Sequence, residues 1–141
     1  MGFLSGKKAL ITGIASKRSI AYGIAQSMAR EGAELALTYQ NEKLKPRVEN
    51  IAEQLGSNVC IELDVAGEES IDDAFSNLAS HWKNLDILIH SIAHAPSEEL
   101  KGSYIDSVSR DGFNMANEIS SYSFVALAKK AWPIMNTNGA L

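Results

Sequence analysis

Four short apolar runs alternate with segments of helical periodicity, and this alternation constrains the fold more than any other feature of the chain. The runs cover Lys8–Thr12, Glu34–Tyr39, Asn58–Leu63 and Leu85–Ser91. Strands that alternate with helices at this spacing form a parallel sheet with right-handed crossovers. We therefore predict an α/β fold with a doubly wound parallel sheet and the strand order 3-2-1-4.

The segments between and after these runs have the periodicity and the boundary residues of helices. In the first helix Ile20, Ile24 and Met28 are expected to share the buried face, and Gly23 to let the helix lie close to the sheet. The expected helices cover about residues 20–31, 42–55, 68–82 and 110–131. Asn136–Gly139 is typical of a turn, and Ala140-Leu141 of the beginning of a fifth strand, so the sheet is expected to be truncated there.

Composition excludes several classes of protein. The chain has 141 residues, 13 basic and 17 acidic side chains and a formal charge of −4, so nothing favours binding to nucleic acid or to an anionic membrane. No apolar run is long enough to span a bilayer, and Met1–Ser5 is too short for a signal peptide. Cys60 is the single cysteine, which excludes an internal disulfide and suits a reducing, cytoplasmic setting.

The turn after the first strand has the features of an anion site. Gly13 ends the strand, Ser16 and Ser19 follow, and a helix begins at Ile20. Unpaired backbone N–H groups and the positive end of the helix dipole would face one point there. Gly13 permits a close approach that a side chain would block, although the spacing is not the three-glycine dinucleotide fingerprint. The turn therefore predicts a phosphate or pyrophosphate site.

Two other strand ends are expected to meet the same ligand, because ligands bind where the strand order of such a sheet reverses. Gln40 closes the second strand, where its amide could bond ribose hydroxyls without binding a 2′-phosphate. This favours NAD over NADP, although Lys43 and Arg47 keep the question open. Asp64-Val65 closes the third strand and could bind the edge of adenine, although a helix-capping role for Asp64 is equally compatible.

The histidines and the cysteine do not indicate a further site. His90 and His94 lie on a strand and its following turn without a third ligand, so we predict a structural role for His90 and no metal site. Cys60 lies in the middle of a strand, where a core position is more common than a nucleophile.

Several motifs together resemble one known family, the bacterial NADH-dependent enoyl-acyl-carrier-protein reductases, which are divergent short-chain dehydrogenases/reductases with a Rossmann-like fold. The resemblance covers Met1 to Leu141. The motifs that carry it are Gly13-Ile-Ala-Ser16-Lys-Arg-Ser19-Ile20-Ala21-Tyr22-Gly23, Tyr39-Gln40-Asn41, Leu63-Asp64-Val65, His90-Ser91-Ile92-Ala93 and Glu118-Ile-Ser-Ser-Tyr-Ser-Phe-Val125.

The resemblance implies a role for particular residues. Ala95 would touch the acyl substrate, while Ala93-His94 stand where the family usually has glycine and then an aromatic residue, which puts the acyl-chain fit in doubt. The resemblance implies NAD as the cofactor, and its contacts would be Gly13, Ser19, Ile20, Gln40, Asp64, Val65 and Ile92.

The family's reaction is hydride transfer from NADH to a trans-2-enoyl thioester on acyl carrier protein, in fatty acid biosynthesis. Its catalytic Tyr-x6-Lys pair belongs to a segment after the fifth strand, which this chain lacks. Tyr122 and Lys129 reproduce that spacing, but only four strands precede them, so we assign no catalytic residue here. Residues 1–141 are thus expected to form a single dinucleotide-binding domain that is C-terminally incomplete. This domain would supply most of the cofactor site and be inactive alone. The full-length enzyme is expected to be a homotetramer.

Two other functions are compatible with the same motifs. A non-catalytic dinucleotide-binding module would bind NADH without turnover. A different short-chain dehydrogenase, acting on sugars or alcohols, would share the fold but usually shows a glycine-rich first turn and Asn-Asn-Ala-Gly after the fourth strand, neither of which occurs here.

Overall fold

The computed structural model describes residues 2–141. Met1 lies outside the described residues; it belongs to Met1–Ser5, which we predict to be too short for a signal peptide. The strands are β1 (Lys8–Ile11), β2 (Glu34–Tyr39), β3 (Val59–Glu62), β4 (Leu85–Ile89) and β5 (Met135–Ala140). The α-helices are α1 (Ile20–Arg30), α2 (Lys45–Gln54), α3 (Glu68–His81), α4 (Tyr104–Ser107), α5 (Arg110–Asn117) and α6 (Ser123–Ala131). Shorter helical turns are η1 (Ser97–Leu100), η2 (Glu118–Tyr122, a π turn) and η3 (Trp132–Ile134).

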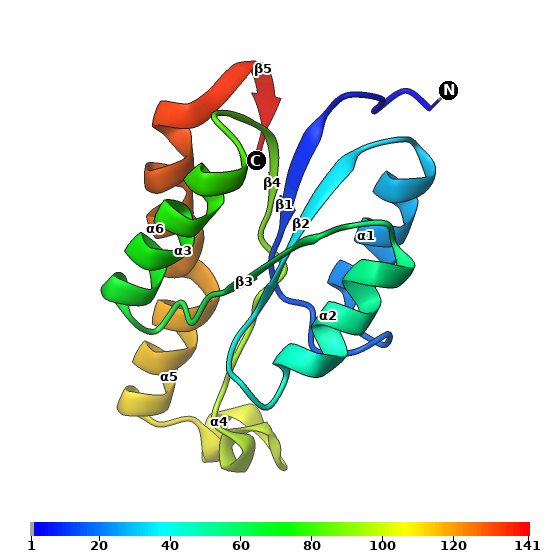
Figure 1. Ribbon diagram of the computed structural model, residues 1–141. Helices are drawn as coiled ribbons and strands as arrows, with labels where there is room; N and C mark the ends of the chain where they lie inside the picture. The colour runs from blue at the N-terminus through cyan, green and yellow to red at the C-terminus, as the bar shows by residue number, and fades with distance from the viewer. Residues whose placement is uncertain (1) are drawn as a thin grey trace.

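The strands form one parallel sheet in the order β3-β2-β1-β4-β5 (Figure 1). Leu10 in β1 pairs with Ala36 in β2 and with Leu88 in β4. The doubly wound sheet and the order 3-2-1-4 predicted from the sequence are therefore confirmed. Because β1 lies between β2 and β4, the strand order reverses beside it, which opens a crevice at the carboxyl ends of these strands.

The fifth strand is longer than the sequence indicates. The predicted turn at Asn136–Gly139 is wrong, because these residues belong to β5, where Met135 pairs with Leu85 and Ala140 with Ile87. The strand bulges between these pairs, and Asn138 there adopts a φ of 66°. Asparagine and glycine are depleted in strands, so the local sequence does not indicate a strand here. The strand forms because these residues pair with β4.

A buried carboxylate fixes the start of β5 against the centre of the sheet. Asp86 accepts hydrogen bonds from Asn136 Nδ2 and from the Lys8 N–H, both at 2.9 Å. Burial by itself would raise the pKa of Asp86, but these two bonds and the nearby Lys7 ammonium lower it below its ordinary value. The ionised carboxylate therefore joins β1, β4 and β5 at the amino-terminal edge.

Helices cover both faces of the sheet, with α1 and α2 on one side and α3 and α6 on the other (Figure 1). Two groups of buried apolar side chains result, one against each face. The first includes Ile11, Leu37 and Ile51, and the second includes Leu78, Leu88 and Leu127. Each such side chain stabilises the fold by about 1.5–3 kcal/mol relative to an exposed one.

The buried face of α1 differs from the prediction. Ala21 and Ala25 are fully buried, whereas Ile20 is 78% exposed and Ile24 and Met28 are only half-buried. The small alanine side chains let the helix lie close to the sheet. Ile20, Ile24 and Met28, each next to an alanine in sequence, therefore lie at the side of the helix and not against the sheet. Gly23 is exposed, with open space where a Cβ would stand, so its predicted role in close packing is also wrong.

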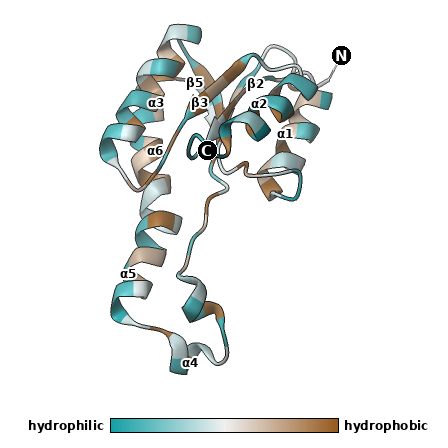
Figure 2. Cartoon of the chain, turned by 60° about the horizontal axis from the view of Figure 1, so that its bottom comes forward, coloured by the Kyte–Doolittle hydropathy of each residue, from teal (hydrophilic) through white to brown (hydrophobic). Residues whose placement is uncertain are grey.

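The long helix predicted for residues 110–131 is continuous, but it contains the π turn η2 between α5 and α6. Its α5 end, together with α4, extends away from the sheet as an arm (Figure 2). Within residues 2–141, no helix has the length and apolar character needed to cross a membrane.

Candidate functional site

The turn after β1 and the turn after β4 are in direct contact. Thr12 is fully buried and donates to the Ile89 carbonyl through both its N–H, at 3.0 Å, and its Oγ1, at 2.8 Å. Gly13 follows with a φ of 94°, and a Cβ at this position would lie 1.9 Å from the Ser91 carbonyl oxygen. Only glycine fits here, and the close approach that the sequence predicts is made to protein backbone.

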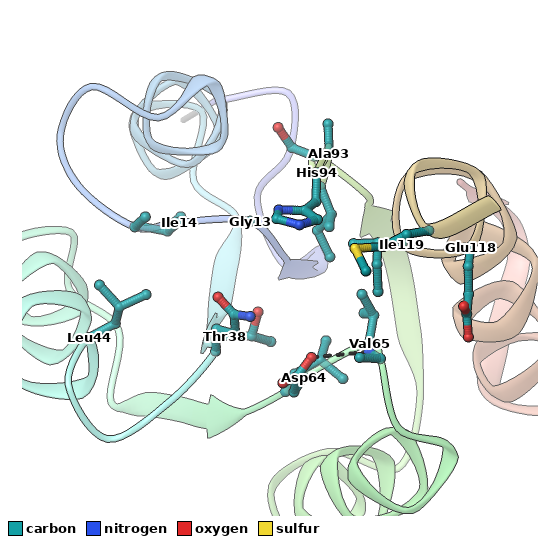
Figure 3. A pocket seen from close by; sticks show the side chains of 17 residues that line it. Gly13, Ile14, Thr38, Leu44, Asp64, Val65, Ala93, His94, Glu118 and Ile119 are labelled. Carbon is teal, nitrogen blue, oxygen red and sulfur yellow. Dashed lines mark hydrogen bonds between the residues drawn. The ribbon is translucent and has the colours of Figure 1, made fainter. Parts of the chain in front are cut away.

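A cavity of about 570 Å³ lies at the carboxyl ends of β1 to β4, where the crevice is expected (Figure 3). Its walls come from the turn after β1, the ends of β2 and β3, the turn after β4 and the α5–η2 helix. The lining residues are 13–15, 38, 40, 44, 63–66, 91–94, 115, 118 and 119. The arrangement brings together four strand ends that are far apart in sequence.

Most of the residues proposed as cofactor contacts line this cavity, namely Gly13, Gln40, Asp64, Val65 and Ile92. The other two proposed cofactor contacts, Ser19 and Ile20, and the proposed substrate contact Ala95 lie outside its lining. Ile20 stands at the start of α1 with its side chain largely exposed. The binding roles of all eight stay predictions.

Ser19 organises the turn after β1. Its Oγ accepts hydrogen bonds from the Ala15 N–H at 3.0 Å and from the Ser16 N–H at 3.1 Å. The expectation of unpaired amides at these two positions is therefore wrong, because the serine hydroxyl satisfies both. The hydroxyl proton of Ser19 is not used in either bond, so it is available to an anion above the turn.

Asp64 does not cap α3, so the helix-capping alternative is wrong, and its contact with adenine stays a prediction. Its Oδ1 accepts from the Ala66 N–H at 3.0 Å, and its own N–H donates to Ser70 Oγ at 2.8 Å. These bonds stabilise the turn before α3, whose N-cap is Gly67. Asp64 also lines the cavity, and its second carboxylate oxygen remains available to a hydrogen-bond donor.

Ser120 of the π turn η2 and Ser123, the first residue of α6, hold the segment after β4, an arrangement that the sequence analysis missed. Ser123 is fully buried; its Oγ donates to the Ile119 carbonyl at 2.6 Å and lies 2.7 Å from His90 Nε2. Since the hydroxyl has one proton, Nε2 carries the hydrogen of this bond. Ser120 Oγ accepts from the His94 N–H at 2.9 Å. The only sequence signal was the small, hydroxyl-rich composition of this helix.

His90 is a packed residue outside the cavity lining. Its ring meets Phe124 edge to face with centroids 5.4 Å apart, and burial lowers the pKa of His90. Within residues 2–141 no group of three or more His, Cys, Asp or Glu side chains is arranged to hold a metal ion. Cys60 is half-buried, and desolvation with the nearby Glu49 charge raises the pKa of its thiol to about 11, which disfavours the nucleophilic thiolate.

Tyr122 and Lys129, which imitate a catalytic spacing, do not line the cavity. The Tyr122 hydroxyl donates to Glu68 Oε1 at 3.2 Å, across the contact between η2 and α3. This bond and the charge of Glu68 raise the pKa of Tyr122. A hydroxyl in this position stabilises helix packing.

A comparison with known proteins identifies the family of this chain. The family model described as "Enoyl-(Acyl carrier protein) reductase" matches residues 13–141. The chain belongs to this family. The NADH-dependent enoyl-[acyl-carrier-protein] reductase FabI of Escherichia coli is 57% identical over 141 residues, which are all of this chain and 54% of that protein. The corresponding Aquifex aeolicus enzyme is 51% identical over 142 residues, or 100% of this chain and 52% of that protein.

Solved structures of enoyl reductases have the same fold. The crystal structure from Aquifex aeolicus has a TM-score of 0.92 at 51% identity and covers 96% of this chain and 53% of its own. The structure from Anaplasma phagocytophilum, which is in complex with NAD, has a TM-score of 0.90 at 42% identity and covers 95% and 51%. The chain thus spans about half the length of these enoyl reductases.

Proposed function

We propose that the whole protein carrying this sequence reduces a trans-2-enoyl thioester on acyl carrier protein with NADH, in fatty acid biosynthesis. The observation that carries the proposal is the cavity formed by the β1 and β4 turns with the ends of β2 and β3. Its support is the family match, the NADH dependence in the names of the relatives and the NAD in a similar structure. Residues 1–141 would then form a single dinucleotide-binding domain.

The residues of this chain would bind and orient the cofactor, which supplies the hydride when bound. The Gly13 turn, with the free proton of Ser19, suits the phosphates, while Gln40 and Asp64 offer polar groups to the adenosine half. The proposed contacts are Gly13, Ser19, Ile20, Gln40, Asp64, Val65 and Ile92 for the cofactor and Ala95 for the acyl substrate. We assign no catalytic residue in this chain.

Turnover by the whole protein tests the proposal. We expect the absorbance of NADH to fall on addition of an enoyl thioester, and Tyr122→Phe to leave the rate within about twofold of wild type because its hydroxyl bonds Glu68 outside the cavity. The isolated 141 residues are expected not to turn over.

The possible results separate the alternatives. NADH binding without turnover by the whole protein would indicate a non-catalytic module, and oxidation of alcohols or sugars would indicate another short-chain dehydrogenase. A loss of turnover of a hundredfold or more in Tyr122→Phe would assign this tyrosine to the active site instead.

The full-length protein is also proposed to be a homotetramer in the cytoplasm. The support for assembly is the exposed apolar side chains of the 110–131 helix, with Phe113 52% and Val125 60% exposed. A single cysteine suits the reducing compartment.

A further inference from the structure

Glu99 joins the turn η1 to the start of α5, within the arm that extends away from the sheet (Figure 2). Its Oε1 accepts hydrogen bonds from the Ser109 N–H, at 3.2 Å, and from the Ser109 hydroxyl. Ser109 Oγ in turn caps α5 by accepting from the Gly112 N–H at 3.0 Å. The carboxylate therefore connects two points of the arm that are ten residues apart in sequence.

The carboxylate has room at this place because residue 112 is a glycine. Gly112 is buried, and a Cβ there would overlap the carboxylate of Glu99. Gly112 lies inside α5 without a positive φ, so the backbone itself does not require glycine. Glycine inside a helix is less favourable than alanine. What this glycine provides is the space that the Glu99 side chain occupies.

The segment between the cavity and η1 is attached to the long helix at both of its ends. At one end Ser120 Oγ accepts from the His94 N–H at 2.9 Å and donates to the His94 carbonyl at 3.2 Å. At the other end Glu99 is bonded to Ser109, and the Glu99 N–H donates to the Pro96 carbonyl at 3.0 Å. Ala95 and Pro96 lie half-buried between these attachments, directly after the cavity-lining His94.

We propose that Glu99 is a positioning residue for the acyl substrate, because its bonds to Ser109 hold Ala95 and Pro96 in place as a wall of the acyl-chain site. The inference rests on the proposed function, in which Ala95 touches the acyl chain. A segment that is already held in its binding geometry loses less entropy when the substrate binds. Without the carboxylate, η1 and Pro96 are free to move away from α5, and the substrate has to order them.

The effect should fall on substrate binding and leave the cofactor site unchanged. The turns after β1 and β4 are held by other bonds, from Thr12 to the Ile89 carbonyl and from Ser120 to His94. Loss of the Glu99 bonds therefore raises KM for the enoyl thioester, while kcat and the Kd of NADH stay within about twofold. Two hydrogen bonds that order a short segment correspond to a change of about three- to tenfold in KM.

The test is steady-state turnover, with NADH, of a trans-2-dodecenoyl thioester of acyl carrier protein by the whole protein. We expect Glu99→Ala to raise KM about three- to tenfold. Glu99→Gln should stay within about twofold of wild type, because the amide oxygen accepts the same two bonds. Gly112→Ala should raise KM as Glu99→Ala does, since its methyl group displaces the carboxylate while favouring the helix.

Glu98→Ala is the matched control. Glu98 is the exposed neighbour of Glu99, and its Oε1 accepts from Ser97 Oγ, at 3.1 Å, within the same turn. We expect its KM to equal that of wild type. Amide hydrogen exchange gives a second measurement: residues 95–100 should exchange faster in Glu99→Ala and not in Glu98→Ala, with the strands of the sheet unchanged in both.

The outcomes separate the inference from the function on which it rests. An unchanged KM in both Glu99→Ala and Gly112→Ala overturns the inference and leaves the proposed function intact. A Glu99→Gln protein as impaired as Glu99→Ala also overturns it, and so does a fall in kcat at constant KM. A wild-type protein that does not oxidise NADH with the enoyl thioester overturns the proposed function, and the inference with it.

Discussion

At Gly13 the backbone of one turn touches the backbone of another, which makes this the residue of the site least tolerant of change. Gly13→Ala would place a Cβ 1.9 Å from the Ser91 carbonyl oxygen at a φ of 94°. We expect a loss of about 1–3 kcal/mol in the free energy of unfolding, measured by urea denaturation, and weaker NADH binding.

A second glycine provides the control for this experiment. Gly23 lies inside α1 with open space around the position of a Cβ, so Gly23→Ala should raise the free energy of unfolding by about 0.5–1 kcal/mol. Equal stability of the Gly13→Ala protein and wild type would contradict the close contact between the two turns.

At the scale of elements, η2 and the first residue of α6 bind the long helix to the segment after β4. Ser123→Ala would remove the buried partner of His90 Nε2, and we expect the free energy of unfolding to fall by about 1–3 kcal/mol. Ser121→Ala, at an exposed position two residues earlier in η2, should change it by at most about 0.5 kcal/mol. Equal losses in the two variants, measured by denaturation, would show that the hydrogen bond to His90 does not stabilise the contact between the long helix and the segment after β4.

At the scale of the whole molecule, apolar side chains remain exposed along the helix of residues 110–131. If this face joins subunits, as proposed, Val125→Arg places a charge in the interface and should shift the whole protein to a smaller assembly, measured by light scattering. Phe3→Arg is the control, because Phe3 is 81% exposed and belongs to a different part of the chain. An unchanged assembly in Val125→Arg would exclude this helix face as the contact.

The alternation of strands and helices, and with it the order of the first four strands, was predictable from local sequence. Parallel strands need crossover helices, and the handedness of these crossovers leaves few topologies. The same logic located the crevice, because the residues that close strands of a parallel sheet gather at one edge. Gly13, Gln40, Asp64 and Val65 were found in this way, whereas Ile92 followed from the family resemblance.

The tertiary structure decided what depends on contacts between distant segments. Pairing with β4 makes Asn136–Gly139 part of a strand, Ala21 and Ala25 pack where larger neighbours do not fit, and Ser19 satisfies two amides that local sequence left unpaired. The π turn that brings Glu118 and Ile119 to the cavity also has no local pattern. Periodicity shows which residues are apolar, but only packing fixes how each element is rotated and which polar groups meet.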